Sequence, residues 1–253
     1  MLKHFNWPGL IFMAALLLAW ELSARAIASP SYPGFVAVVA ALVTDLPTLY
    51  AQTGITLWRA AAGFALALAT MVPLGIFIGR TRRIGHYVEP VIDLLRPLPP
   101  LAIVPVAMLF AGTGSAAKIS VIFYSAAFPI LINAIDATRA THPLLINVGR
   151  SVGLSRAEIM LRIDLPAALP QIMAGVRLSV ALALLISVSS EMLLSTDGLG
   201  NYLMRAQEQF QIAGGLAGIV VIALVSLLVN TVVLRVEQWL LAWHHERHRL
   251  ARG

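Results

Sequence analysis

The middle of the chain reads Gly153-Leu-Ser-Arg-Ala-Glu-Ile-Met-Leu-Arg-Ile-Asp-Leu-Pro166, a polar stretch between two long apolar segments. It carries two arginines, one glutamate and one aspartate. Ionised side chains are costly in the hydrocarbon of a membrane, so we expect this stretch at a membrane surface. The polar segment 153–166 therefore divides the chain, and the apolar segments on either side of it are interpreted as membrane spans.

Local signals inside the polar segment predict a turn followed by a short helix. Gly153 is suited to the left-handed conformation that ends one helix and lets another begin. Ser155 and Glu158 have the spacing of a capping box, so we expect a helix over residues 156–162 that ends at Pro166. Its apolar side chains have the i, i+3, i+4 spacing that suits a groove on a partner protein, and they are Ala157, Met160 and Leu161. An amphipathic helix lying on lipid headgroups is the alternative.

Composition places the whole chain in a lipid bilayer. Hydrophobic residues make up 59% of the chain, charged residues 12%, and the mean hydropathy is +0.84. Soluble domains are about 45–50% apolar, and a spanning helix needs about 20 mostly apolar residues. Six segments qualify, approximately 7–25, 54–79, 97–117, 119–136, 166–194 and 214–236. We predict an all-α, polytopic membrane protein with six transmembrane helices, forming a single transmembrane domain over residues 1–253.

The basic residues indicate the orientation of these spans, because short cytoplasmic loops retain lysine and arginine. On the side that holds the polar segment lie Lys3, Arg80, Arg82, Arg83, Arg96, Arg139, Arg150, Arg156, Arg162, Arg247, Arg249 and Arg252. On the other side lie Arg25, Lys118 and Arg205. We therefore expect both termini and the polar segment in the cytoplasm. Topology and contact with anionic membrane lipid account for the net charge of +6, so no nucleic-acid partner is expected.

The first apolar segment allows two interpretations. Lys3 and His4, the apolar stretch 10–19 and the small residues at 26–28 together resemble a cleavable signal peptide. The interpretation that we favour is a retained first span over residues 7–25. The orientation of the remaining spans is the same in both cases.

Four prolines lie close together at the start of the third predicted span: Pro97, Pro99, Pro100 and Pro105. An interior proline removes a helical hydrogen bond and clashes with the preceding turn. Irregular backbone at membrane depth is tolerated where protein or a water-filled cavity satisfies its polar groups. The cluster predicts either a broken helix beside a transport pathway, with Pro97, Pro99 and Pro100 as pathway residues, or a kinked entry at the cytoplasmic interface.

Arg59 and Glu191 are ionisable residues inside predicted spans, where such side chains are usually functional. Arg59 lies about five residues into the second span and Glu191 about three from the end of the fifth, so their depths differ by about 3 Å. We predict that they pair or share one polar network at an outer gate. The alternative is that each side chain reaches the outer interface separately.

The polar segment resembles the signature of ABC importer permeases of the binding-protein-dependent transport family. That signature is Glu-Ala-Ala, three residues, Gly, nine residues, then Ile-x-Leu-Pro. Gly153, Ile163, Leu165 and Pro166 occupy the matching positions. The Glu-Ala-Ala triplet is replaced by Asn147-Val148-Gly149, which removes a carboxylate and introduces a glycine that costs about 1 kcal/mol relative to alanine in a helix.

Further stretches extend the resemblance to approximately residues 30–240 and to permeases for nitrate, taurine, aliphatic sulfonates and vitamin precursors. These stretches are Arg96-Pro-Leu-Pro-Pro-Leu-Ala102, Phe128-Pro-Ile-Leu-Ile-Asn133, Leu165-Pro-Ala-Ala-Leu-Pro170 and Glu191-Met-Leu-Leu-Ser-Thr-Asp-Gly-Leu-Gly200. The resemblance implies that the chain forms the pathway for a small solute, an organic or inorganic anion or a vitamin precursor.

The same resemblance implies a set of partners in the bacterial cytoplasmic (inner) membrane. They are a second permease copy in a homodimer, two ATPase subunits and an external substrate-binding protein. ATP and Mg would be bound by the ATPase, so no catalytic, cofactor or metal residue is assigned to this chain. The resemblance places ATPase coupling in the loop 139–166. Its coupling residues are Gly153, Leu154, Ser155, Arg156, Ala157, Glu158, Met160, Leu161, Ile163, Leu165 and Pro166.

Other functional classes have weaker support. An ion-coupled secondary transporter needs ion ligands near the middle of the membrane, whereas Asp93, Asp136 and Glu237 lie near segment ends. The stretch Gly112-Thr-Gly-Ser-Ala-Ala-Lys118 lacks the glycine directly before lysine that a phosphate-binding loop requires. The chain has no cysteine, which excludes disulfides, thiolate catalysis and cysteine-ligated metal.

Overall fold

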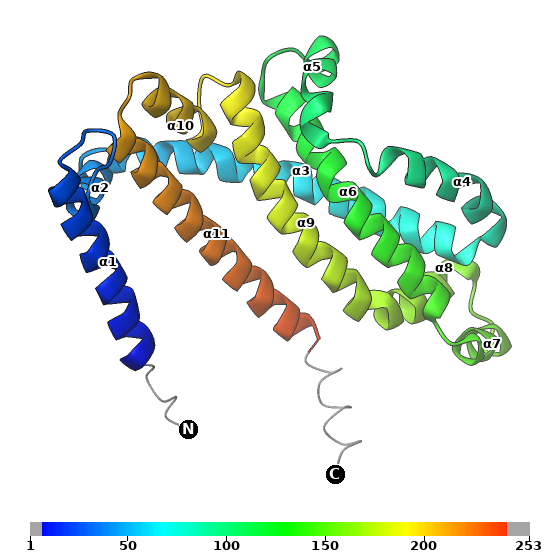
Figure 1. Cartoon of the computed structure of the whole chain (residues 1–253). Helices are drawn as coiled ribbons and strands as arrows, with labels where there is room; N and C mark the ends of the chain where they lie inside the picture. The colour runs from blue at the N-terminus through cyan, green and yellow to red at the C-terminus, as the bar shows by residue number, and fades with distance from the viewer. Residues whose placement is uncertain (1–6, 242–253) are drawn as a thin grey trace.

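The computed structural model describes residues 7–241, and in this range every regular element is a helix (Figure 1). The elements are α1 (Trp7–Ile27), α2 (Phe35–Thr44), α3 (Leu46–Arg80), α4 (Arg82–Leu95), α5 (Pro100–Ala111), α6 (Ser115–Ala140), α7 (Pro143–Ser151), α8 (Arg156–Ile159), the π-helix η1 (Met160–Asp164), α9 (Leu165–Leu194), α10 (Leu199–Glu208) and α11 (Ile212–Leu240). Within this range, five helices are long and apolar enough to cross a membrane. The predicted all-α membrane fold is therefore confirmed.

The helix α5 lies within the span that the sequence predicted at 97–117, and α4 precedes that span. The two helices qualify as a span only together, and they are bent by 99° at the break between them. Pro99 is extended, with ψ of 123°, because a residue before a proline avoids the helical region. The chain is thus broken at the proline cluster, as the broken-helix interpretation predicted, and the sixth span is formed only if α4 and α5 are taken together.

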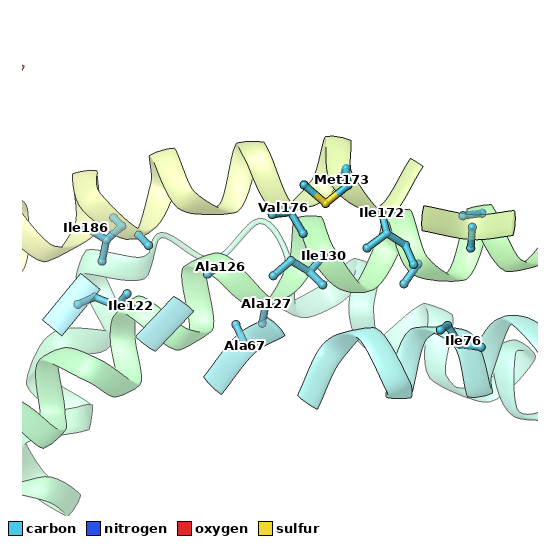
Figure 2. Close-up of a cluster of buried hydrophobic side chains, with 14 of the residues drawn as sticks. Ala67, Ile76, Ile122, Ala126, Ala127, Ile130, Ile172, Met173, Val176 and Ile186 are labelled. Atoms are coloured by element: carbon cyan, nitrogen blue, oxygen red, sulfur yellow. The ribbon is translucent and has the colours of Figure 1, made fainter. Parts of the chain in front are cut away.

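The core of the fold lies where α6 packs between α3 and α9 (Figure 2). Small residues allow the helices to approach closely, as is common between membrane helices. Ala67, Ala126 and Ala134 are almost fully buried in this cluster. A Cβ atom at Gly75 of α3 would lie only 2.5 Å from the Cβ of Ala134, so a larger residue would force the two helices apart.

The helices α1 and α11 lie at the edge of this core. In their most apolar windows only 6% of α1 and 17% of α11 is buried, compared with 56% of the helix that includes α9. Arg177 of α9 and Glu237 of α11 form an ion pair. The first turn of α1 and the last turn of α11 lie on the same side of the molecule as α7 and α8 (Figure 1). Most of the surface of α1 and α11 is thus exposed within residues 7–241.

Candidate functional sites: the coupling loop and a buried ion-pair cluster

The turn between α7 and α8 has the geometry that the sequence predicted for Gly153. Its φ is +81°, the left-handed conformation that glycine adopts without steric penalty. The Gly153 N–H donates to the carbonyl of Arg150 at 3.0 Å, and the Leu154 N–H donates to the carbonyl of Gly149 at 3.0 Å. This pair of bonds is a Schellman motif, which satisfies the last carbonyls of α7.

The predicted capping box at the start of α8 is confirmed. The Glu158 N–H donates to Ser155 Oγ at 3.3 Å, and Glu158 Oε2 accepts from the Ser155 N–H at 2.9 Å. Two backbone N–H groups at the helix start are satisfied in this way. The turn and the cap together fix where α8 begins relative to α7.

The helix that starts at α8 differs from the prediction in its path. After Ile159 the chain becomes the π-helix η1, in which the Leu165 N–H donates to the carbonyl of Met160 five residues back. Pro166 is the second residue of α9, which follows directly after η1, and the helix runs unbroken from Arg156 to Leu193 over 38 residues. Residues 156–162 are helical as predicted, although the helix is of the π type from Met160 onward, whereas the predicted end at Pro166 is wrong.

The loop 139–166 is called the coupling loop here, after its expected role. Its exposed apolar surface is larger than the sequence predicted. Ala157 is exposed and Leu161 is 60% exposed, in agreement with the expected anchors, whereas Met160 packs against the core cluster. The π-turn displaces the side chains from the α-helical spacing assumed for them. The sequence also missed the apolar side chains that α7 and the residue after it expose in the same loop, which are Leu144, Leu145, Val148 and Val152.

Gly149, which replaces the last alanine of the family triplet, is buried under η1. A Cβ atom there would lie 2.6 Å from Cδ1 of Ile163 and 3.5 Å from Cδ1 of Leu154. The missing methyl group thus makes room for Ile163, and α7 packs closely on η1. Asn147 and Val148 of the same triplet are exposed. The departure from the family pattern is accommodated by packing inside the loop.

An ion pair between a buried aspartate and a partly exposed arginine connects the coupling loop to α3, and the sequence did not predict it. Arg80, the last residue of α3, donates through Nε to Asp164 Oδ2 at 2.9 Å and through Nη2 to the other oxygen. The Asp164 side chain is 1% exposed and that of Arg80 is 31% exposed. Arg80 was interpreted only as a topology signal, and Asp164 was assigned to a polar surface. Only the fold brings the two residues together.

Arg59 of α3 and Glu191 of α9 form the pair that the sequence predicted. Arg59 Nη1 lies 3.0 Å from Glu191 Oε1, and the two side chains are 3% and 0% exposed. Arg59 also donates to Asp197 Oδ1 at 2.6 Å and to Ser115 Oγ at 3.1 Å. A buried charge is tolerated when it is paired and hydrogen-bonded, and these contacts satisfy the guanidinium from several directions.

The loop between α9 and α10 wraps around the Glu191 carboxylate. Glu191 Oε2 accepts from Thr56 Oγ1 at 2.8 Å and from the Gly200 N–H at 3.2 Å. A Cβ at Gly198, whose φ is +94°, would lie 2.2 Å from Cδ of Glu191, and one at Gly200 would lie 2.1 Å from the carbonyl of Val188. Only glycine fits at these two positions, which explains the stretch Glu191–Gly200 noted in the sequence.

Asp197 completes the ion-pair cluster, which we define as Arg59, Glu191, Asp197 and Thr56. Partial burial acts to raise the pKa of Asp197, but hydrogen bonds from Arg59 and Ser195 outweigh it and hold that pKa below the ordinary aspartate value. The carboxylate is therefore ionised at neutral pH, and two carboxylates share one guanidinium.

Residues 71–242, about two thirds of the chain, match the protein family described as Binding-protein-dependent transport system inner membrane component. The chain belongs to this family. The match covers the coupling loop and the Glu191–Gly200 stretch. The permease is therefore the membrane component of an ABC transporter of the inner membrane, and this membership favours ATP-driven transport over the ion-coupled alternative.

Relatives of known type span almost the whole permease. The putative aliphatic sulfonates transport permease protein of Bacillus subtilis is 30% identical, with 96% of this chain and 90% of that protein covered. The nitrate import permease protein of Synechococcus elongatus is 30% identical, with 93% and 87% covered. The taurine transport system permease protein of Escherichia coli is 30% identical, with 79% and 72% covered. The chain thus falls within the predicted subgroup of permeases.

A solved structure shares the fold of the permease. It is the MetNI methionine ABC transporter in an inward-facing conformation, with a TM-score of 0.69 and 17% sequence identity. The alignment covers 78% of this chain and 98% of that chain. The arrangement of helices is therefore that of an ABC importer permease.

Proposed function

We propose that this permease imports a small organic or inorganic anion, or a vitamin precursor, that an external binding protein delivers. In this proposal two copies form a homodimer with the pathway between them, and two ATPase subunits bind ATP and Mg. The named substrates of the relatives, aliphatic sulfonates, nitrate and taurine, support an anionic substrate. This chain itself contributes the pathway and the contact with the ATPase.

The observation that carries the proposal is the exposed apolar face of the coupling loop. Large side chains of α7 and η1 lie open to solvent, with Leu144 and Leu161 each about 60% exposed. An exposed apolar patch rimmed by polar residues favours an interface with another protein. Arg156 and Arg162 lie beside it and are exposed. A groove on the ATPase with apolar walls and an acidic rim fits this surface.

The orientation follows the same surface in this proposal. The ATPase is cytoplasmic, so α7 and α8 lie on the cytoplasmic side. The start of α1 and the end of α11 lie on that side too (Figure 1), which supports cytoplasmic termini. The ion-pair cluster and the loop 195–198 then lie toward the outer face, where we place a gate that closes the pathway. The broken span with Pro97, Pro99 and Pro100 borders the pathway.

Ala157→Arg in the complete transporter tests the coupling surface. An arginine on this exposed position leaves folding unchanged but places a charge in the apolar interface, so ATPase co-purification and uptake should each fall at least about tenfold. Thr113→Arg is the matched control, since Thr113 is exposed in the loop before α6. Wild-type co-purification and uptake with Ala157→Arg would reject the assigned docking surface.

A further inference from the structure

A pocket of about 320 Å³ lies beside the break between α4 and α5. Its polar lining comes from Arg96, Ser125 and Asn133, and Tyr124 and Phe128 form an aromatic wall. The wall is fixed in place, because the two rings pack edge to face at 5.0 Å and the Tyr124 hydroxyl donates to the carbonyl of Leu95. This volume is at the lower end of the range for small-molecule sites.

Two donors that face this pocket have no partner elsewhere in the described residues. Ser125 is 6% exposed, and within residues 7–241 its hydroxyl makes no hydrogen bond. The Arg96 guanidinium forms no ion pair or hydrogen bond in the same range. No buried side-chain nitrogen or oxygen among residues 7–241 lacks a hydrogen-bond partner, so the Ser125 hydroxyl is reached from the pocket and is available to a ligand there. No other pocket described here combines an arginine without an ion-pair partner and a hydroxyl without a hydrogen bond.

The charged and polar side chains that line the pocket indicate which class of ligand it would bind. No aspartate or glutamate lines the pocket. Pro100, where α5 begins, is a lining residue, so the positive end of the α5 dipole lies at the pocket as well. Asn133 Nδ2 donates to the carbonyl of Pro129 at 2.8 Å and retains a second N–H for a ligand. Guanidinium, hydroxyl and amide donors together suit a small oxyanion.

The geometry points to a binding site for a small oxyanion, of the sulfonate or carboxylate kind, between the broken span and α6, with Arg96, Ser125 and Asn133 as its ligands. The site deepens the proposed function, since it would hold the transported anion on its way through the membrane. Arg96 supplies the charge, and Ser125 and Asn133 orient the oxygens. The site exists because the 99° bend exposes the end of α4 and the start of α5 to the same space.

Titration of the purified permease in lipid nanodiscs with ethanesulfonate, followed by calorimetry, tests the site. We expect saturable binding that the uncharged dimethyl sulfone does not reproduce. Arg96→Ala should weaken binding by about tenfold or more, the loss expected for a charged hydrogen-bond partner, and Ser125→Ala should weaken it less. Arg83→Ala, an exposed arginine of α4 outside the pocket, is the matched control and should bind normally.

Three results would overturn the site: no saturable binding to the wild type, equal binding by Arg96→Ala, or equal binding of dimethyl sulfone. Arg96 is exposed and lies at the end of α4, so its replacement leaves the core unchanged, and unfolding midpoints without ligand check this. The assay needs no ATPase. If only the binding site is wrong, the ATPase should still co-purify with the permease. If the transport proposal is wrong, the ATPase should not co-purify, and anion binding could still be observed.

Discussion

The two ends of the α3–α9 contact each hold an ion pair with a buried carboxylate, but the surroundings of the two pairs differ. At one end Glu191 is fully buried and accepts hydrogen bonds from Arg59, Thr56 and the Gly200 N–H. At the other end Asp164 is bound by Arg80 alone among the described residues, and the Arg80 side chain is 31% exposed. The first is a closed network and the second is a single pair at a surface.

The difference indicates separate roles for the two ends. Removing one member of the closed network leaves a charge in the protein interior, so that end is expected to be stable and to change state only as a unit. Arg80 can reach water if its partner leaves, so its pair can open at low cost. In the proposed function, a connection that moves with the ATPase would need an ion pair of the second kind, which can open and close.

The largest effect is expected from Glu191→Ala. It leaves the Arg59 guanidinium, which is 3% exposed, with only partial compensation by Asp197, and should lower the free energy of unfolding by about 3–5 kcal/mol. Thermal unfolding of the purified permease measures this change. Glu208→Ala, at an exposed position of α10, is the control. Replacing both members, as in Arg59→Met with Glu191→Met, should recover much of the loss, and failure to do so would argue against a mutual pairing.

Gly198→Ala should have the next largest effect. The new methyl group would meet the Glu191 carboxylate at about 2.2 Å, in addition to the strain of a positive φ, at a combined cost of about 2–3 kcal/mol. Gly112→Ala isolates the strain alone, because Gly112 has a φ of +72° and nothing within 4 Å of a Cβ. Equal unfolding midpoints for the two variants would show that the loop does not close on Glu191.

Asp164→Ala should cost less stability than Glu191→Ala and affect coupling more. Arg80 keeps access to water, so we expect a loss of about 1–2 kcal/mol in unfolding free energy. Uptake per ATP hydrolysed should fall in reconstituted transporter, because α3 is released from the coupling loop. Asp136→Ala, at an exposed residue of α6, is the control. A normal ratio of uptake to hydrolysis would assign the pair to stability alone.

The smallest effect is expected from Asp197, whose side chain is 41% exposed. Asp197→Asn should cost about 1 kcal/mol or less at neutral pH. Its pKa is lowered in the folded protein, so its contribution is present above the ordinary aspartate pKa and is lost as the pH falls through the lowered value. Acid titration of unfolding should show this loss in the wild type but not in Asp197→Asn; identical acid profiles would exclude the contribution.

Hydropathy predicted the membrane helices well, because whether a segment can cross a membrane depends on the composition of that segment alone. It could not predict that α3 begins at Leu46 and that α4 and α5 meet at 99°. Prolines indicate where a helix breaks, whereas the direction of the new helix depends on packing against α6. The short helix α7 was missed for the same reason, because its buried face is defined by η1.

Local motifs predicted the candidate sites better than distant contacts. The left-handed Gly153 and the Ser155–Glu158 box depend on neighbours in sequence, and both are confirmed. The Arg59–Glu191 pair was found because two isolated charges in apolar spans have few possible partners. Asp164 lies in a stretch rich in charge, where nothing in the sequence distinguishes the one carboxylate that is buried.

The unbroken helix from Arg156 to Leu193 connects the coupling loop with the ion-pair cluster. At a rise of about 1.5 Å per residue its 38 residues extend about 57 Å. If α6 holds the middle of this helix, a tilt imposed at α8 is expected to move the end at Glu191 in the opposite direction. Because η1 is wound differently from the rest of the helix, it is where we expect part of such a movement to be absorbed.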